Sequence, residues 1–178
     1  LHRSPDVIVK RNAAVVLANC AEESVDLRQE LVHRGVLETL SGQMNVGGGG
    51  NGDGYVRAIR DITRVLSCLS TVGEGRNFMT RDPQKGDAIM KRLLSLSRSA
   101  DAPTQRNAAL ALCNVCLGQN LDDTEDTSER IAAIISAGAS KSLSFLCKFP
   151  DREVQRLAAL SFAGLSLRYH TSKRSLVQ

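Results

Sequence analysis

The sequence predicts an all-α fold in which short helical units stack side by side around a continuous apolar core. Three observations lead to this prediction. An apolar segment with helical spacing recurs along the 178 residues, and pairs of shorter apolar segments joined by a glycine lie between its copies. No segment shows the strict alternation of a strand. Aromatic residues make up only 3% of the chain and tryptophan is absent, so the core must be built from Leu, Val, Ile and Ala.

The longest recurring segments predict four long helices. Each contains an arginine followed by small and apolar residues at helical spacing. The matching stretches are residues 10–19, 59–68, 105–114 and 155–164. Their shared arginines are Arg11, Arg60, Arg106 and Arg156, with separations of 49, 46 and 50 residues. These periods are near the ~40–47 residues of two- and three-helix repeats, and two of the three are slightly longer. We therefore expect long helices near residues 6–21, 54–71, 101–118 and 151–168.

Shorter apolar segments between these helices predict a glycine turn. Residues 31–40 align with residues 134–143, and each stretch contains an apolar helix end, a glycine and a new apolar helix. The glycines are Gly35 and Gly138. Glycine adopts at low cost the left-handed backbone that commonly follows a helix end. Each unit is therefore predicted to have a short helix, a glycine turn, a second helix and a longer third helix.

Two stretches interrupt this pattern. Residues 45–54 are rich in glycine and predict a flexible loop between a second and a third helix. A nucleotide-binding loop would need a preceding strand and a phosphate-holding helix, and neither a strand nor a Gly-Lys-Ser/Thr motif is present. Residues 121–129 form an acidic connector, and their carboxylates precede a helix start, where the helix dipole favours negative charge.

These segments resemble the armadillo repeat family. Residues 105–115 (QRNAALALCNV) and 154–166 (VQRLAALSFAGLS) are similar to its third helix, and residues 129–138 (ERIAAIISAG) to its first helix and following turn. HEAT repeats are the alternative, but the glycine turn and an asparagine near the end of the third helix favour armadillo. The resemblance implies a right-handed α-α superhelix, an armadillo-repeat solenoid, that covers residues 1–178 as a single array.

The ends of the chain lack the polar capping repeats that a free-standing array needs. The chain opens on a third helix, and residues 172–178 are similar to the beginning of a first helix. We therefore expect an excerpt of a longer solenoid with about four units, the terminal ones partial. A naturally short array with irregular caps is the alternative.

Asparagines gather on one face of two of the long helices. With Asn19 as the reference on a helical wheel, Asn12 lies within about 40° whereas Ala14 falls on the far side. The same geometry places Asn107 and Asn114 together. The resemblance implies that this face lines a concave groove, where the amides bind the backbone of an extended peptide. The alternative is a capping or inter-repeat hydrogen bond.

The groove face also departs from the family pattern. Cys68 and Gly164 replace asparagine in two units. The tryptophans that nuclear-import adaptors carry four residues earlier are absent, because those positions hold Val15, Arg64, Leu110 and Leu160. Without these rings, the slots for the lysines of an import signal are missing. We therefore do not expect import-adaptor activity.

Arginines accompany the asparagines in the second unit. Arg57, Arg60 and Arg64 fall within about 80° of the groove centre. The flanking arginines at the repeat positions, among them Arg156, extend this set into a basic ladder. Arginine pairs bidentately with carboxylates and phosphates, so the ladder predicts an acidic extended ligand, as in catenin-like armadillo proteins. The alternative is a solvated face on which Asp61 and neighbouring acids balance the charge.

No catalytic or metal-binding set is visible in the sequence. Cys113 and Cys116 have C-x-x-C spacing, but no second ligand pair for zinc exists and both fall inside a predicted helix. The five cysteines are an odd number within apolar stretches, which is typical of reduced thiols inside cells. The three histidines are scattered. We therefore expect no enzyme activity, no metal and no cofactor.

These observations predict a scaffold or adaptor that binds other proteins through extended, acidic peptide segments. The predicted partner-binding residues are Asn12, Asn19, Arg57, Arg60, Arg64, Asn107, Asn114 and Arg156. Two alternatives remain: a helical repeat that binds nucleic acid, and a regulatory array of an enzyme, such as a ubiquitin ligase, with its catalytic part elsewhere. The net charge of +4 is mild and only Tyr55 and Tyr169 could stack on bases, which disfavours nucleic acid. No apolar run reaches the ~18 residues of a membrane span, and we expect a cytoplasmic protein, with cytoskeletal or nuclear association as variants.

Overall fold

The computed structural model of this chain describes residues 7–44, 53–117, 134–135 and 138–175, and in these ranges every regular element is a helix. The described helices are α1 (Val7–Glu23), α2 (Val25–His33), α3 (Val36–Met44), α4 (Asp53–Leu69), α5 (Gly73–Arg81), α6 (Lys85–Leu96), α7 (Ala102–Leu117), α9 (Ala139–Leu146) and α10 (Arg152–Ser175). The glycine-rich loop expected at residues 45–54 and the acidic connector at residues 121–129 lie almost wholly outside the described residues.

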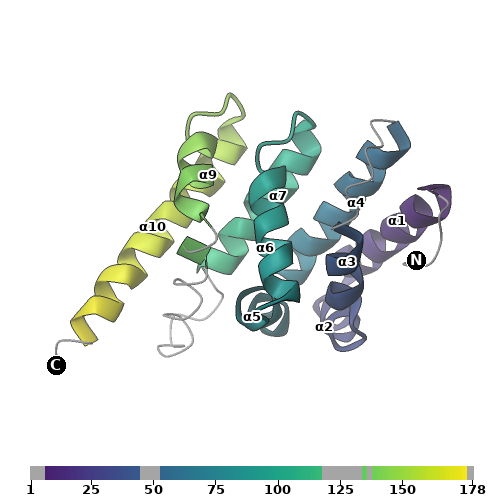
Figure 1. The fold of residues 1–178 in the computed structure, drawn as a ribbon, viewed down its shortest axis with the longest axis horizontal. Helices are drawn as coiled ribbons and strands as arrows, with labels where there is room; N and C mark the ends of the chain where they lie inside the picture. Colours follow the sequence, from purple (N-terminus) through teal and green to yellow (C-terminus); the bar gives the residue numbers. More distant parts are fainter. Residues whose placement is uncertain (1–6, 45–52, 118–133, 136–137, 176–178) are drawn as a thin grey trace.

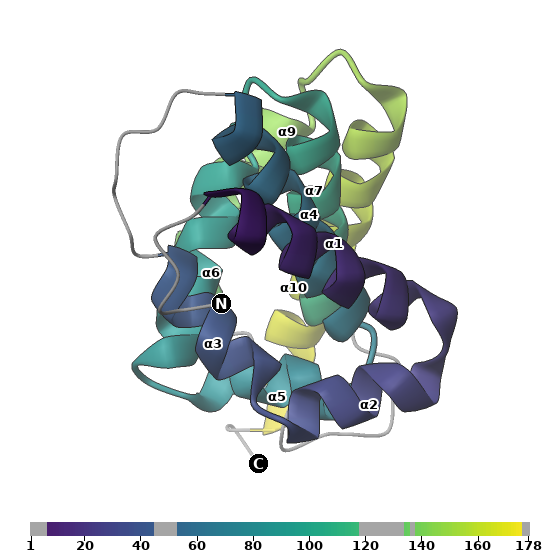
Figure 2. The same ribbon diagram turned by 90° about the vertical axis from the view of Figure 1, so that its right-hand side faces the viewer.

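The helices stack in rows. The long helices α1, α4, α7 and α10 pack one against the next in chain order, and α3, α6 and α9 form a second row (Figure 1). The first helices α2 and α5 also contact each other. Figure 2 shows the same stack from the α1 end. The predicted all-α repeat fold is therefore confirmed, and among the described residues the units α2–α4 and α5–α7 each contribute one helix to each of these rows.

Small side chains let neighbouring long helices approach closely. In α7, which has a long helix on either side, Ala108, Ala109 and Leu112 are buried at 0–1% exposure whereas Leu110 on the opposite face is 36% exposed. This is the division between apolar and outward faces that the helical wheel predicts. In α10 the residues equivalent to Ala109 and Leu110 are Ala159 and Leu160, and both are exposed. Ala159 is exposed whereas Ala109 is buried, because within the described residues α10 packs against a long helix on one side only.

The turns between first and second helices use two different devices. Gly35 has a φ of 73° and Gly138 a φ of 92°, so both adopt the left-handed backbone predicted for them. The turn between α5 and α6 has no such glycine. There the Asp82 carboxylate accepts hydrogen bonds from the backbone N–H groups of Gln84 (3.0 Å) and Lys85 (2.6 Å). These hydrogen bonds lower the pKa of Asp82, and the carboxylate caps the start of α6.

The end of α4 is closed by an arginine from the next unit. Arg76 on α5 is only 5% exposed, and its Nη1 donates a hydrogen bond to the backbone oxygen of Thr71 (2.8 Å). Positive charge is favourable beside the carbonyl end of a helix. Arg28 on α2 reaches the same corner, donating to the oxygen of Ala21 (2.6 Å) and to Oγ1 of Thr71 (3.1 Å). The two arginines therefore fix α2 and α5 to the ends of the long helices.

One boundary differs from the prediction. Residues 172–175 continue α10 instead of beginning a new first helix. The sequence here carries no glycine or proline that would end the helix. Within the described residues, no helix combines the length and the apolar character that crossing a membrane requires.

Candidate functional site

A groove with a volume of about 820 Å³ lies between the long helices α1 and α4. Its lining consists of Arg11, Asn12, Val15 and Val16 from α1, and of Asp53, Val56, Arg57, Arg60, Asp61 and Arg64 from α4. Four of the predicted partner-binding residues are in this set, namely Asn12, Arg57, Arg60 and Arg64. The others, Asn19, Asn107, Asn114 and Arg156, do not line this groove.

Valines provide the apolar part of the groove. Val16 is 60% exposed and Val56 is 36% exposed, while Val15 is half-buried. Sequence analysis did not single out Val16 or Val56, because an isolated exposed valine on a helix carries no signal by itself. The valines lie on both walls of the groove, beside arginines and the Asn12 amide. Together these residues form a surface that can bind apolar and polar groups at the same time.

Arg60 is held by the next unit. Its Nη2 lies 2.6 Å from Oδ1 of Asp101, and its Nε donates to Oδ2 of the same carboxylate at 3.2 Å. Asp101 precedes α7 and also accepts the backbone N–H of Thr104 (3.1 Å) and its hydroxyl (2.6 Å), so it caps that helix. The hydrogen bonds from Arg60, followed by those from Thr104, lower the pKa of Asp101 to about 2 against the cost of burial.

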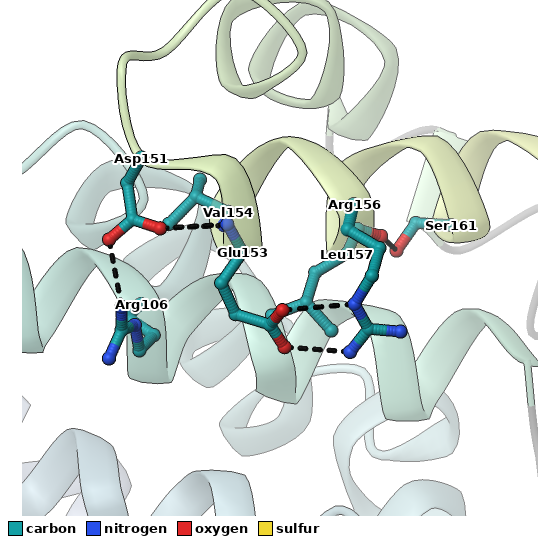
Figure 3. A network of polar contacts seen from close by, with 7 residues as sticks. All are labelled: Arg106, Asp151, Glu153, Val154, Arg156, Leu157 and Ser161. Atoms are coloured by element: carbon teal, nitrogen blue, oxygen red, sulfur yellow. Dashed lines mark hydrogen bonds and ion pairs between the residues drawn. The ribbon is translucent and has the colours of Figure 1, made fainter.

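The same arrangement recurs one unit later. Arg106 on α7 donates to Oδ2 of Asp151 at 3.0 Å, and Oδ1 of Asp151 accepts the backbone N–H of Glu153 (2.8 Å) and Val154 (3.2 Å) at the start of α10 (Figure 3). The repeated arginine of one long helix thus holds the capping aspartate of the next. We call these two pairs, Arg60–Asp101 and Arg106–Asp151, the cap bridges.

Arg156 occupies the equivalent position in α10 but pairs within its own helix. Its Nε and Nη2 donate to the exposed carboxylate of Glu153 at 2.9 and 2.6 Å (Figure 3). This hydrogen-bonded pair lowers the pKa of Glu153 and raises the pKa of Arg156. The predicted basic ladder is therefore a set of ion pairs at Arg60, Arg106 and Arg156.

Arg64 lies among neutralising groups. Its Nη2 donates to Oδ1 of Asn19 (2.9 Å) and lies 3.7 Å from Asp61, and its Nε lies 3.3 Å from Glu22. The carbonyl oxygen of Asn19 is therefore engaged by Arg64 across the α1–α4 contact. This part of the groove corresponds to the alternative left open by the sequence, in which Asp61 and neighbouring acids balance the arginine charge.

Asn114 adopts the structural role that sequence analysis left as an alternative. Its Nδ2 donates to the backbone oxygen of Ser67 (3.2 Å) and to Oγ of Ser70 (3.0 Å), which joins α7 to the end of α4. Asn114 is half-buried there. Both amide donors are therefore used between repeats, and they are not available to a ligand backbone in this arrangement.

Arg57 and Arg11 differ from the other groove arginines. Arg57 is exposed, and among the described residues it has neither an ion pair nor a hydrogen bond with another side chain. Arg11 is half-buried and donates one hydrogen bond to Oδ1 of the adjacent Asn12 at 3.3 Å, without a carboxylate partner among the described residues. These two cations come from opposite walls of the groove.

The cysteines contribute to packing. Cys113 and Cys116 are buried in α7, and burial is the main reason that the pKa of the Cys113 thiol is raised. A raised pKa disfavours the thiolate that metal binding or nucleophilic attack would need. In the part of the chain that the structure describes, no three histidine, cysteine or acidic residues are grouped in a way that could hold a metal ion.

No known family model and no curated protein matches the sequence. Solved structures match it along its length. An engineered protein is 25% identical with a TM-score of 0.70 and aligns over 92% of this chain and 58% of its own. A structure of computationally designed armadillo repeat proteins for modular peptide recognition is 23% identical with a TM-score of 0.70, and the alignment covers 92% of this chain and 61% of that one. A designed armadillo repeat protein in complex with the peptide (KR)4 is 20% identical with a TM-score of 0.68, and the alignment covers 93% of this chain and 61% of that one. The chain spans about three fifths of the length of these structures.

Proposed function

We propose that this chain, which has the fold of armadillo repeat proteins, is a binding scaffold that holds an extended polypeptide segment in the groove between α1 and α4. The observation that carries the proposal is the groove itself, in which exposed valines lie beside an asparagine amide and arginines on the row of long helices. One of the similar designed proteins is in complex with the peptide (KR)4 and another is described as designed for modular peptide recognition, which supports peptide binding as a use of this fold.

The chemistry of the groove suits an extended chain. The amide of Asn12 offers both donors and an acceptor, so it can pair with a peptide group whatever its side chain. The valines can bury part of an apolar side chain. The stacked helices hold these groups in place before the ligand arrives, which reduces the ordering entropy that binding must overcome. Binding, not catalysis, is the proposed role.

The balance of charge around the groove favours an acidic segment. Four arginines line it against two aspartates, Asp53 and Asp61. Asp101 and Glu22 pair with Arg60 and Arg64, but Arg11 and Arg57 have no carboxylate partner among the described residues. A ligand with carboxylates would therefore meet uncompensated positive charge at these two arginines, and its association would be faster at low salt. We accordingly propose that the chain serves as an adaptor for partners that present an acidic extended segment.

An unbiased peptide selection tests the proposal. The 178-residue chain would be challenged with a random peptide display library that contains acidic, basic and neutral sequences. Bound peptides would then be located by chemical-shift changes of backbone amides. We expect the largest changes on α1 and α4.

A matched pair of variants controls for indirect effects. Val16→Gln removes an apolar contact inside the groove, whereas Val25→Gln makes the same change on α2, outside the lining, at a residue of similar exposure (53% against 60%). Affinity should fall only for Val16→Gln. Failure to select any peptide, or equal affinity of both variants and wild type, would overturn the proposal.

A further inference from the structure

The four arginines of the groove fall into two pairs with different surroundings. Arg60 and Arg64 are engaged within the protein by Asp101, Asp61, Glu22 and Asn19. Arg57 and Arg11 have no carboxylate partner among the described residues. An arginine that is already paired has much of its charge neutralised and some of its five N–H donors occupied, so it gains less from an anionic ligand than an arginine without a carboxylate partner.

We infer that Arg11 and Arg57 are the residues that bind an anionic side chain of the peptide, while Arg60 and Arg64 hold neighbouring repeats together. This inference rests on the proposed function and assigns the ligand class of the same groove. Arg11 and Arg57 come from α1 and α4 respectively, so an anion between them joins the two walls. Planar guanidinium groups bind carboxylate and phosphoryl oxygens through paired hydrogen bonds.

The surroundings of this arginine pair also restrict the rest of the ligand. Val15 and Val16 follow Arg11 by about one helical turn, and Val56 is adjacent to Arg57. An aliphatic side chain two residues from the anion points to the same side of an extended peptide and can contact these valines. Asp53 also lines the groove and has no ion pair among the described residues, so it repels a second anion. The acidic segment that this groove prefers is therefore one in which a single anionic residue is flanked by aliphatic residues, and not one with a run of acidic residues.

A synthetic octapeptide tests this assignment. The probe is fluorescein-labelled Ser-Val-Ser-Glu-Ser-Val-Ser-Ser, in which both valines are two residues from the glutamate. Three relatives carry glutamine, phosphoserine or lysine in place of the glutamate, and a fourth carries glutamate in place of every serine. Fluorescence anisotropy gives the Kd of each for the 178-residue chain. We expect the peptides with one anionic residue, glutamate or phosphoserine, to bind more tightly than the glutamine, lysine and all-glutamate peptides.

Protein variants then identify the arginines involved. Arg57→Gln and Arg11→Gln should each raise the Kd of the glutamate peptide about threefold to tenfold and leave the Kd of the glutamine peptide unchanged. Arg60→Gln should lower the Tm with less than about a twofold change in Kd. Arg34→Gln serves as a control: Arg34 directly follows α2 and, among the described residues, its side chain pairs with Glu30 of that helix, so this variant should bind both peptides as the wild type does. The ratio of the glutamate and phosphoserine affinities shows whether a carboxylate or a phosphoryl group is the better anion.

The outcomes separate this inference from the proposed function. Equal affinity of the glutamate and glutamine peptides, or a larger affinity loss for Arg60→Gln than for Arg57→Gln, overturns the inference. If selected peptides still bind at α1 and α4 and remain sensitive to Val16→Gln, the groove function stands without it. If no peptide is selected from the library at all, the proposed function fails as well.

Discussion

Asparagine in place of Asp101 removes one cap bridge and leaves the helix cap. The side-chain oxygen of asparagine can still accept the hydrogen bonds from Thr104, because asparagine and aspartate are similarly good N-caps. The charge that Arg60 binds is lost. The pKa of Asp101 is lowered from 3.8 to about 2 in the folded protein, which corresponds to about 2 kcal/mol of stability at neutral pH. Because the Arg60 side chain remains 39% exposed, solvent screening reduces our expectation for Asp101→Asn to about 1 kcal/mol.

The dependence on pH has a defined sign. A carboxyl group with a lowered pKa stabilises the folded state fully above its unfolded pKa of 3.8, and this contribution is lost as the pH falls through about 2. The stability difference between wild type and Asp101→Asn should therefore be constant from pH 7 to about pH 5 and shrink towards zero below pH 3. Urea unfolding followed by circular dichroism measures it at each pH. At pH 7 the Tm of the variant should be about 2–4 °C lower.

A second substitution controls for the loss of an acidic group as such. Asp87→Asn removes the exposed pair with Lys91 on α6, and we expect it to change stability by less than about 0.5 kcal/mol. If Asp101→Asn were as stable as wild type at pH 7, the cap bridge would contribute nothing. If its deficit persisted undiminished at pH 2, the cause would lie in packing and not in the charge.

Three further perturbations test other parts of the structure. Gly86→Ala should cost at least about 3 kcal/mol, since its Cβ would lie 2.2 Å from a carbonyl oxygen of α5, whereas Gly138→Ala has open space and should cost about 1–2 kcal/mol through its positive φ alone; thermal unfolding compares the two, and equal losses would contradict this. Asn114→Ala should lower stability by about 1–2 kcal/mol and leave peptide affinity unchanged; a loss of affinity at constant Tm would return Asn114 to the binding surface. Asp151→Asn should lower the Tm less than Asp101→Asn, because its arginine partner is more exposed (54% against 39%); a larger decrease would show that exposure does not set the strength of a cap bridge.

The fold could be predicted from local and periodic signals. The alternation of small and large apolar residues at helical spacing defines the long helices, and the positive φ of Gly35 and Gly138 is the feature that glycine at a helix end indicates. The turn at Asp82 could not be predicted from a glycine, because a side chain closes it. Its signal, an aspartate just before a helix, is weaker because aspartate also occurs on exposed surfaces.

The roles of the groove arginines could not be read in the same way. The cap bridges join residues that are 41 and 45 positions apart, and a helical wheel of one helix contains no information on its neighbour. A faint signal was present: Asp101 and Asp151 each precede the repeated arginine by five residues. Extending the repeat alignment towards the amino terminus would have shown this shared spacing. Asn114 would lie on the same face of α7 whether its amide bound a peptide in the groove or joined two repeats. Only the position of Ser70 on the neighbouring unit shows that the amide joins the repeats.

The cap bridges give the array a direction. In each, the arginine belongs to the earlier unit and the aspartate to the later one. Removing units from the amino-terminal side would strip the following helix of the cation that holds its capping carboxylate. Removing units from the carboxy-terminal side would leave an arginine such as Arg106 without its aspartate, but the aspartates of the remaining cap bridges would keep their arginines. Shortened versions of this protein should therefore tolerate trimming from one side better than from the other, although the units themselves are built alike.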